Sequence, residues 1–304
     1  MKSDHLKESR NIEDRRGQSY SQSSGNSNLG GGILQILLSP GSFKSKIIII
    51  LLIVFLGGGG ASLGGLFGNG TSSQPYQSTQ VTRTNKTHVD DADAEFVSKV
   101  LATTEDHWHK VFQAEGRTYQ EPKLVFYTGR TKTGCGVGQA SAGPFYCPTD
   151  KKIYLDMSFY KELTTKYKAS GDFAMAYVIA HEVGHHVQNE LGILGKYHRM
   201  QQGLSEKERN AISVRIELQA DYLAGVWARS IQDRNLLDIG DIEEAMNAAH
   251  AVGDDTLQEQ AYGYSVPDSF THGTSEQRMR WFKRGYQYGD LQHGDTFSLS
   301  DSEL

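Results

Sequence analysis

Residues 171–185 read Gly-Asp-Phe-Ala-Met-Ala-Tyr-Val-Ile-Ala-His-Glu-Val-Gly-His. Nearly every residue before the first histidine is apolar or small, so a helix formed here is expected to be buried. We expect it to begin at Asp172 as N-cap and to stop near Gly192. His181 and His185 are four residues apart, so both imidazoles leave one face of the helix. The sequence therefore predicts that these two histidines bind Zn²⁺.

Glu182 follows the first histidine directly. From that position its carboxylate can reach a metal-bound water without itself binding the metal, which is the geometry of a general base. The alternative is two surface histidines on an ordinary helix, but burying two histidines and a glutamate requires a compensating partner, which a metal supplies. One known class of zinc enzymes has a longer pattern, in which a glycine and a third histidine follow the second histidine. Gln188 and Leu191 occupy those two positions here, so the chain does not belong to that class.

The third metal ligand is then expected from a later helix, over residues 205–231, which opens with a capping-box pattern. Glu217 and Asp221 are four residues apart there and share a face. We assign Glu217 to the metal and Asp221 to the free ring nitrogen of His181, where it would fix the ring's tautomer and angle. The competing candidates for the third ligand are Glu190, His198, His250 and His272.

A third cluster lies in residues 271–282. Thr274 and Gln277 form a capping box, so a helix is expected to begin here. His272, just before that helix, could act in catalysis by donating to an oxyanion at the zinc. Arg278 could orient a carboxylate or a substrate carbonyl. The alternative is a capped surface helix with a histidine satisfied in its own loop.

The remaining elements predict an α+β fold, with a small mixed sheet followed by a helical, zincin-like metallopeptidase core. Short apolar runs bounded by Gly, Pro and Asp predict strands at residues 124–127 and 153–155. Phe145 and Tyr146 follow a Gly-rich stretch and could form an edge strand that pairs with an extended peptide substrate.

The charge of the chain is unevenly distributed. The chain has 304 residues and a net charge of −5. Residues 1–46 contain seven Lys or Arg and four Asp or Glu, whereas the rest of the chain contains 24 Lys or Arg and 32 Asp or Glu. The larger part is therefore acidic and a poor binder of polyanions, so nucleic acid is not an expected partner.

Residues 47–67 are apolar and carry no charge, which is long enough to span a bilayer as a transmembrane helix. A cleaved signal peptide is the alternative, but the charged leader of 46 residues is too long for that class. Lys44 and Lys46 place the N-terminus in the cytoplasm and the catalytic domain outside it, with the lipid bilayer as a partner. The expected division is a largely disordered cytoplasmic tail over 1–46, an anchor over 47–67, a flexible linker over 68–92, a metallopeptidase domain over 93–290 and a C-terminal tail over 291–304.

The only two cysteines are Cys135 and Cys147, with eleven residues between them. A metal site would need further ligands close by, and none is present. We expect a disulfide, which suits an extracytoplasmic domain, with free thiols as the alternative.

The chain resembles the bacterial neutral zinc metallopeptidase family. The segments that carry the resemblance are residues 9–17, the apolar run, the region of Cys135 and Cys147, and residues 181–186, 217–221 and 271–282. The resemblance implies a membrane-attached, zinc-dependent hydrolase acting on peptide or protein substrates. The residues themselves predict a gluzincin-like site in which Glu182 removes a proton from water and passes it to the leaving amine. The alternative is a zinc-bearing envelope binding or assembly protein without proteolysis, for which an intact Glu182 has no use.

Overall fold

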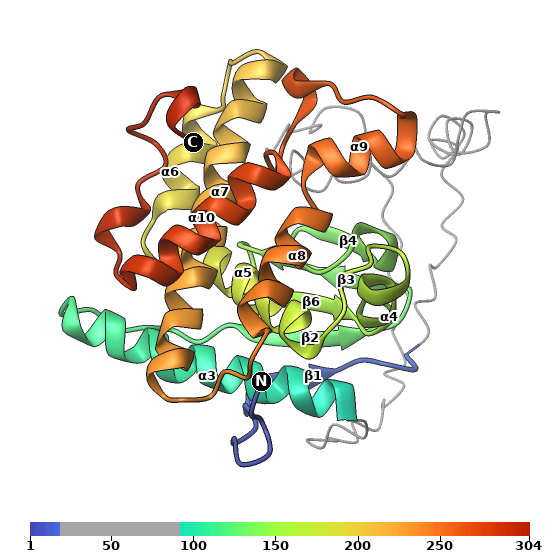
Figure 1. Cartoon of the computed structure of the whole chain (residues 1–304), viewed down its shortest axis with the longest axis vertical. Coiled ribbons are helices and arrows are strands. Elements are labelled where there is room, and N and C mark those ends of the chain that lie inside the picture. Colours follow the sequence, from blue (N-terminus) through green and yellow to red (C-terminus); the bar gives the residue numbers. More distant parts are fainter. Residues whose placement is uncertain (19–91) are drawn as a thin grey trace, which may run out of the picture.

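The computed structural model describes residues 1–18 and 92–304. A small sheet lies beside a set of packed helices, which confirms the predicted α+β class (Figure 1). The strands are β1 (Ile12–Asp14), β2 (Lys123–Tyr127), β3 (Arg130–Thr133), β4 (Gly136–Gln139), β5 (Phe145–Cys147) and β6 (Lys152–Asp156). The helices are α3 (Ala92–Ala114), α4 (Ser158–Thr165), α5 (Asp172–Glu190), α6 (Ile193–Met200), α7 (Glu206–Asp233), α8 (Asp241–Ala251), α9 (Asp254–Tyr262) and α10 (Ser275–Tyr288).

The predicted membrane anchor at 47–67 lies outside the described residues, as does nearly all of the predicted linker. Within the two described ranges, no helix combines the length and the apolar character that a membrane crossing requires.

The main sheet has the strand order β1-β2-β6-β5, with β1, β2 and β6 parallel and β5 antiparallel at the end. The mixed sheet and the two predicted strands are thus confirmed. Alternate residues of β2 and β6 point to opposite faces, as strand geometry requires. Leu124 and Phe126 join the large core under the helices, while Val125 and Tyr127 pack in a smaller cluster with Cys147.

Helix α5, which carries two of the predicted metal ligands, is buried along most of its length and packs against α7 and α8 (Figure 1). Its approach to α7 depends on Gly184, because a Cβ there would lie 2.9 Å from the carbonyl oxygen of Ala220. Any larger residue would push the two helices apart in a close-packed interior. The predicted N-cap was one residue off, since Gly171 holds the cap position and Asp172 is the first helical residue. The capping box expected for α7 is present.

The N-terminal residues 1–18 are not a disordered tail, so that part of the prediction for residues 1–46 was wrong. Strand β1 pairs in parallel with β2, with Ile12 opposite Leu124, and Ile12 packs against the core. The prediction rested on composition, which reports only that such a segment has low hydrophobicity. Composition cannot reveal a pairing partner more than a hundred residues away.

Residues 291–304, expected as a separate C-terminal tail, pack against α7 and α10. Thr296 is fully buried, and its hydroxyl donates to the carbonyl oxygen of Arg215 at 2.7 Å. The indole N–H of Trp281 donates to the carbonyl oxygen of Leu304 at 3.1 Å. The folded body therefore continues past the predicted boundary at residue 290, and Ala92, which was assigned to the linker, is already part of helix α3.

Cys135 and Cys147 form a disulfide with their Cα atoms 5.9 Å apart, which confirms the predicted pairing over free thiols. The bond joins the turn between β3 and β4 to the end strand β5.

Candidate metal centre and active site

Helices α5 and α7 bring three potential metal ligands together: His181, His185 and Glu217. One donor atom of each lies within 4.8 Å of the others. Nε2 of His181 is 3.1 Å from one Glu217 oxygen, and Nε2 of His185 is 3.4 Å from the other. All three residues are buried. The residues proposed from the sequence as zinc ligands therefore meet at one point.

The competing third ligands do not join this group. Glu190 instead pairs with Lys151 at 2.8 Å, and neither His198 nor His250 belongs to the cluster. The assignment of Glu217 as a metal ligand stays a prediction. Among the described residues, its carboxylate is the one that lies beside both His181 and His185.

The donor set suits zinc, because two imidazoles and one carboxylate are the protein ligands of a known class of catalytic zinc sites. Both ring nitrogens of His181 face carboxylates, at 2.8 Å from Asp221 and 3.1 Å from Glu217. Burial alone would lower the pKa of His181, but Asp221 and Glu217 outweigh it and raise the pKa to about 10. The raised pKa means that Nε2 of His181 carries a proton facing Glu217 when no metal is bound. A divalent cation beside Nε2 would satisfy the Glu217 carboxylate in place of this Nε2 proton.

Glu217 is held ionised by its surroundings. Burial would raise the pKa of its carboxyl, but His185 and His272, with the hydrogen bond from His181, bring the pKa well below its usual range. A deprotonated carboxylate is the form that binds a metal.

Asp221 occupies the position predicted for it. Its Oδ1 accepts a hydrogen bond from Nδ1 of His181 at 2.8 Å and from the hydroxyl of Tyr177 at 2.5 Å. With Nδ1 carrying the proton, Nε2 of His181 is the nitrogen left to face Glu217. A carboxylate on the far side of a ligand histidine fixes the ring's orientation and raises its basicity.

Of the two roles predicted for Arg278, orienting a carboxylate is the one that the structure shows, and the carboxylate is that of Asp221. The guanidinium of Arg278 is buried and donates to both oxygens of Asp221, with Nε 2.8 Å from Oδ2 and Nη2 3.0 Å from Oδ1. Burial would raise the pKa of Asp221, but Arg278 and His181 lower it to about 2. The buried charge of Asp221 is stabilised by this cation, which Arg278 supplies from α10.

We expect Asp221→Asn to keep the fold and to weaken zinc binding by about 10–100-fold, the usual cost of losing such a partner. The amide can still occupy the site, but it cannot hold His181 as a carboxylate does. The measurement is zinc affinity by competition with a chelator. Asp233→Asn is the matched control on the same helix, because Asp233 is exposed and pairs with Arg229 away from the ligand cluster. Equal affinities for the two variants would contradict the role given to Asp221.

Gln188 has a role that the sequence analysis missed. Its Oε1 accepts from Nδ1 of His185 at 2.9 Å, and its Nε2 donates to the carbonyl oxygen of Ile216 at 2.8 Å and to Gln219 at 3.1 Å. Gln188 thus orients His185 as Asp221 orients His181. The signal was available, since Gln188 lies three residues after His185 on the same helix face.

The Glu182 carboxylate is buried and, within the described part of the chain, has no hydrogen-bond partner. Burial raises its pKa, although His185 and His181 oppose that rise. A carboxylate with a raised pKa exchanges protons more readily near neutral pH. These properties suit the general base that the sequence predicts.

His272 stands in the loop before α10, where the predicted capping box is present. Asp254 holds this loop, because its Oδ2 accepts from the backbone N–H groups of Thr271 at 2.7 Å, His272 at 2.6 Å and Gly273 at 3.1 Å. Nδ1 of His272 is 3.3 Å from Oδ1 of the same carboxylate. Burial would lower the pKa of His272, but Glu217 and Asp254 raise it. Asp254, which the sequence analysis did not identify, therefore holds His272 where its charge interacts with that of Glu217.

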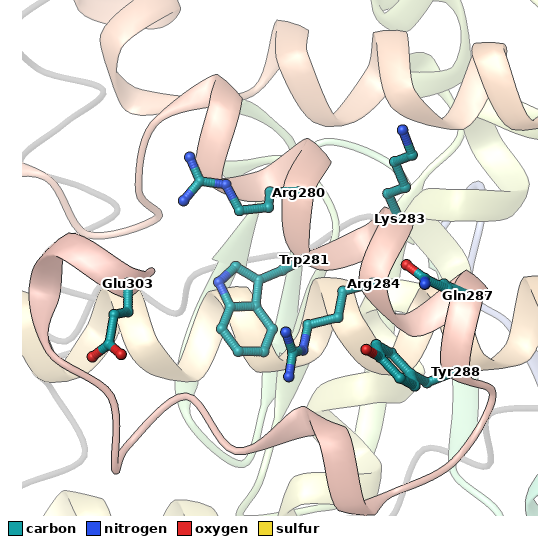
Figure 2. Close-up of a pocket in the computed structure, with 7 residues that line it drawn as sticks. All are labelled: Arg280, Trp281, Lys283, Arg284, Gln287, Tyr288 and Glu303. Carbon is teal, nitrogen blue, oxygen red and sulfur yellow. The ribbon is translucent and has the colours of Figure 1, made fainter.

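A separate surface hollow of about 230 Å³ is lined mainly by α10 (Figure 2). Arg280, Lys283 and Arg284 give it a positive charge, and Arg284 lies over the rings of Trp281 and Tyr288. None of its lining residues belongs to the ligand cluster, so the candidate centre rests on the buried donors alone.

The α+β fold brings the two histidines of an HExxH helix and a carboxylate of a second helix together as a set that could hold a metal ion. The chain belongs to the family described as "Putative neutral zinc metallopeptidase", which it matches over residues 1–297.

Two relatives show how far the similarity extends. The chain is 50% identical to "Uncharacterized protein YpfJ" of Escherichia coli (strain K12) over 294 residues, which is 97% of this chain and 98% of the relative. It is 44% identical to "Uncharacterized protein Rv2575" of Mycobacterium tuberculosis (strain ATCC 25618 / H37Rv) over 194 residues, or 60% and 64% of the two chains. No solved structure matches the chain significantly.

Proposed function

We propose that this protein is a zinc-dependent peptidase in which His181, His185 and Glu217 hold the metal and Glu182 is the general base. The observation that carries the proposal is the convergence of three donors within 4.8 Å, beside a buried carboxylate that has no hydrogen-bond partner among the described residues. When bound, zinc supplies a Lewis acid for the carbonyl oxygen and lowers the pKa of a water molecule.

The protein's own residues would then move the protons. Glu182 accepts a proton from the attacking water and passes it to the nitrogen of the leaving amine. His272 donates to the oxyanion that develops as the carbonyl carbon becomes tetrahedral. Asp221 and Gln188 keep the two ligand histidines in the required tautomers.

We place an extended peptide substrate along β5. This strand lies at the end of the sheet, so one of its edges has no strand partner within the described residues. Its Tyr146 hydroxyl is 3.0 Å from Nδ1 of His186, the residue after the ligand His185. A peptide that adds to this edge by main-chain hydrogen bonds would lie next to the metal-ligand helix.

We further propose that the domain works outside the cytoplasm and associates with a membrane through residues 47–67. The disulfide between Cys135 and Cys147 supports the compartment, because disulfides persist mainly where the surroundings are oxidising.

The test of the proposed function is digestion of a peptide library by the purified, zinc-loaded full chain, with cleavage sites read by mass spectrometry. We expect cleavage of peptide bonds that stops with a chelator and returns when zinc is added back. Stoichiometric zinc with no cleavage of any peptide would contradict the proposal and favour the binding-protein alternative.

We expect His272→Ala to keep zinc affinity unchanged and to lower kcat by about 10²–10³, the usual cost of losing one oxyanion donor. The measurement combines chelator competition with turnover of one cleaved peptide. His198→Ala serves as control, because His198 is exposed and lies outside the ligand cluster. Loss of zinc from His272→Ala would instead make this histidine a ligand.

A further inference from the structure

The N-terminal segment, residues 1–18, completes one edge of the main sheet (Figure 1). Its strand β1 pairs with β2 through hydrogen bonds that continue beyond the strand itself. The amide of Leu124 donates to the carbonyl oxygen of Asn11 at 2.8 Å, and the amide of Arg15 donates to that of Phe126 at 2.8 Å. The edge of β2 is therefore a docking surface whose occupant is this segment.

The side chains of the segment make contacts that a loosely attached tail would not. Glu105 of α3 is buried, and its Oε1 accepts from the hydroxyl of Ser9 at 2.6 Å and from Nδ2 of Asn11 at 2.9 Å. Without the segment, this buried carboxylate would lose both partners, which is costly in a low-dielectric interior. The docking thus satisfies polar groups of the catalytic domain itself.

The charged residues of the segment are also used in docking. Nη1 of Arg15 donates to the carbonyl oxygen of Lys132 at 2.8 Å, and Glu13 pairs with Lys152 of β6 at 2.7 Å. The guanidinium of Arg16 lies over the ring of Phe126. The sequence motif at residues 9–17 is therefore explained by contacts with the body of the protein, with no need for a partner in another compartment.

This docking restricts how the chain can meet a membrane. Paired strands lie about 4.8 Å apart, whereas a bilayer core is about 30 Å thick. A single crossing between residues 18 and 92 would place β1 and β2 on opposite sides. We propose that residues 1–18 lie on the same side of the membrane as the catalytic domain, docked on β2 of their own chain. This differs from the cytoplasmic N-terminal tail expected from the charges beside residues 47–67.

The test uses the full chain with two substitutions, Glu13→Cys and Lys152→Cys, and a site for a specific protease inserted at residue 75. A short, membrane-permeant bismaleimide is added to intact spheroplasts, and the chain is then cut at the inserted site. We expect the two fragments to stay joined in a single-chain product. A control pairs Glu13→Cys with Lys207→Cys, which is exposed on α7, and should give separate fragments.

Two outcomes would overturn the proposal. Cross-links between differently tagged copies would show that the segment docks on a second chain. Each variant that carries only one of the two introduced cysteines, with Cys135 and Cys147 kept as a disulfide, is also labelled with a membrane-impermeant maleimide before and after lysis. This labelling reports the side of the membrane even if cross-linking fails. We expect the two variants to behave alike, so that both are labelled before lysis or both only after it. Labelling of one variant before lysis and of the other only after lysis would place the two positions in different compartments. Neither readout depends on whether the protein cleaves peptides.

Discussion

Glu182→Gln will bind zinc as the unmodified protein does and will fail to cleave peptides. Glutamine has nearly the same shape as glutamate, and the Glu182 carboxylate has no hydrogen bond to lose among the described residues. The substitution removes only the capacity to accept a proton. General base catalysis contributes about 10²–10⁴-fold, so turnover should fall by at least the lower figure.

The measurement for Glu182→Gln combines zinc content, a thermal melt and turnover of a peptide found in the library digest. Glu190→Gln is the matched control, because it makes the same chemical change on the same helix and Glu190 pairs with Lys151 away from the ligand cluster. Turnover of Glu182→Gln above about one hundredth of the unmodified rate would assign the proton transfer to another group.

Glu217→Ala is expected to lose zinc at chelator concentrations that leave the unmodified protein loaded. Two imidazoles alone hold the metal weakly, since catalytic zinc sites use three protein ligands. The loss should exceed the roughly 10–100-fold effect expected for Asp221→Asn, because Glu217 is assigned to the metal and Asp221 only to a ligand histidine. Peptide cleavage should disappear with the zinc.

The assignment of Glu217 is tested by zinc content after dialysis against graded chelator, measured by mass spectrometry for each variant. Glu190→Ala is the control, since Glu190 lies outside the cluster. Full zinc retention by Glu217→Ala, with loss from His272→Ala or His250→Ala, would replace the carboxylate site with one of three histidines. Circular dichroism of the metal-free proteins separates a lost ligand from a lost fold.

The features predicted correctly from the sequence depend on neighbours along the chain. His181 and His185 share a helix face because they are four residues apart, and the same spacing joins Glu217 to Asp221. The capping boxes that begin α7 and α10 are likewise contained in four consecutive residues. Such patterns are set by the helix period, so the sequence alone determines them.

The errors and omissions concern contacts between distant segments. Arg278 was expected to orient a carboxylate or a substrate carbonyl, but the sequence did not identify its partner as Asp221, 57 residues earlier in the chain. Residues 1–18 have the composition of a disordered tail, yet β1 finds its partner in β2. In both cases the side chain or strand pairs with a group whose proximity no local spacing reveals.

The sequence by itself determined the helix that carries His181, Glu182 and His185, and it supplied Glu217 as a candidate ligand. Only the tertiary structure decided that Glu217 lies 3.1 Å from His181. That distance depends on the close crossing of α5 and α7 at Gly184, where a side chain would collide with the backbone of Ala220. Helical spacing follows from local hydrogen bonding, whereas the meeting of two helices follows from how all their neighbours pack.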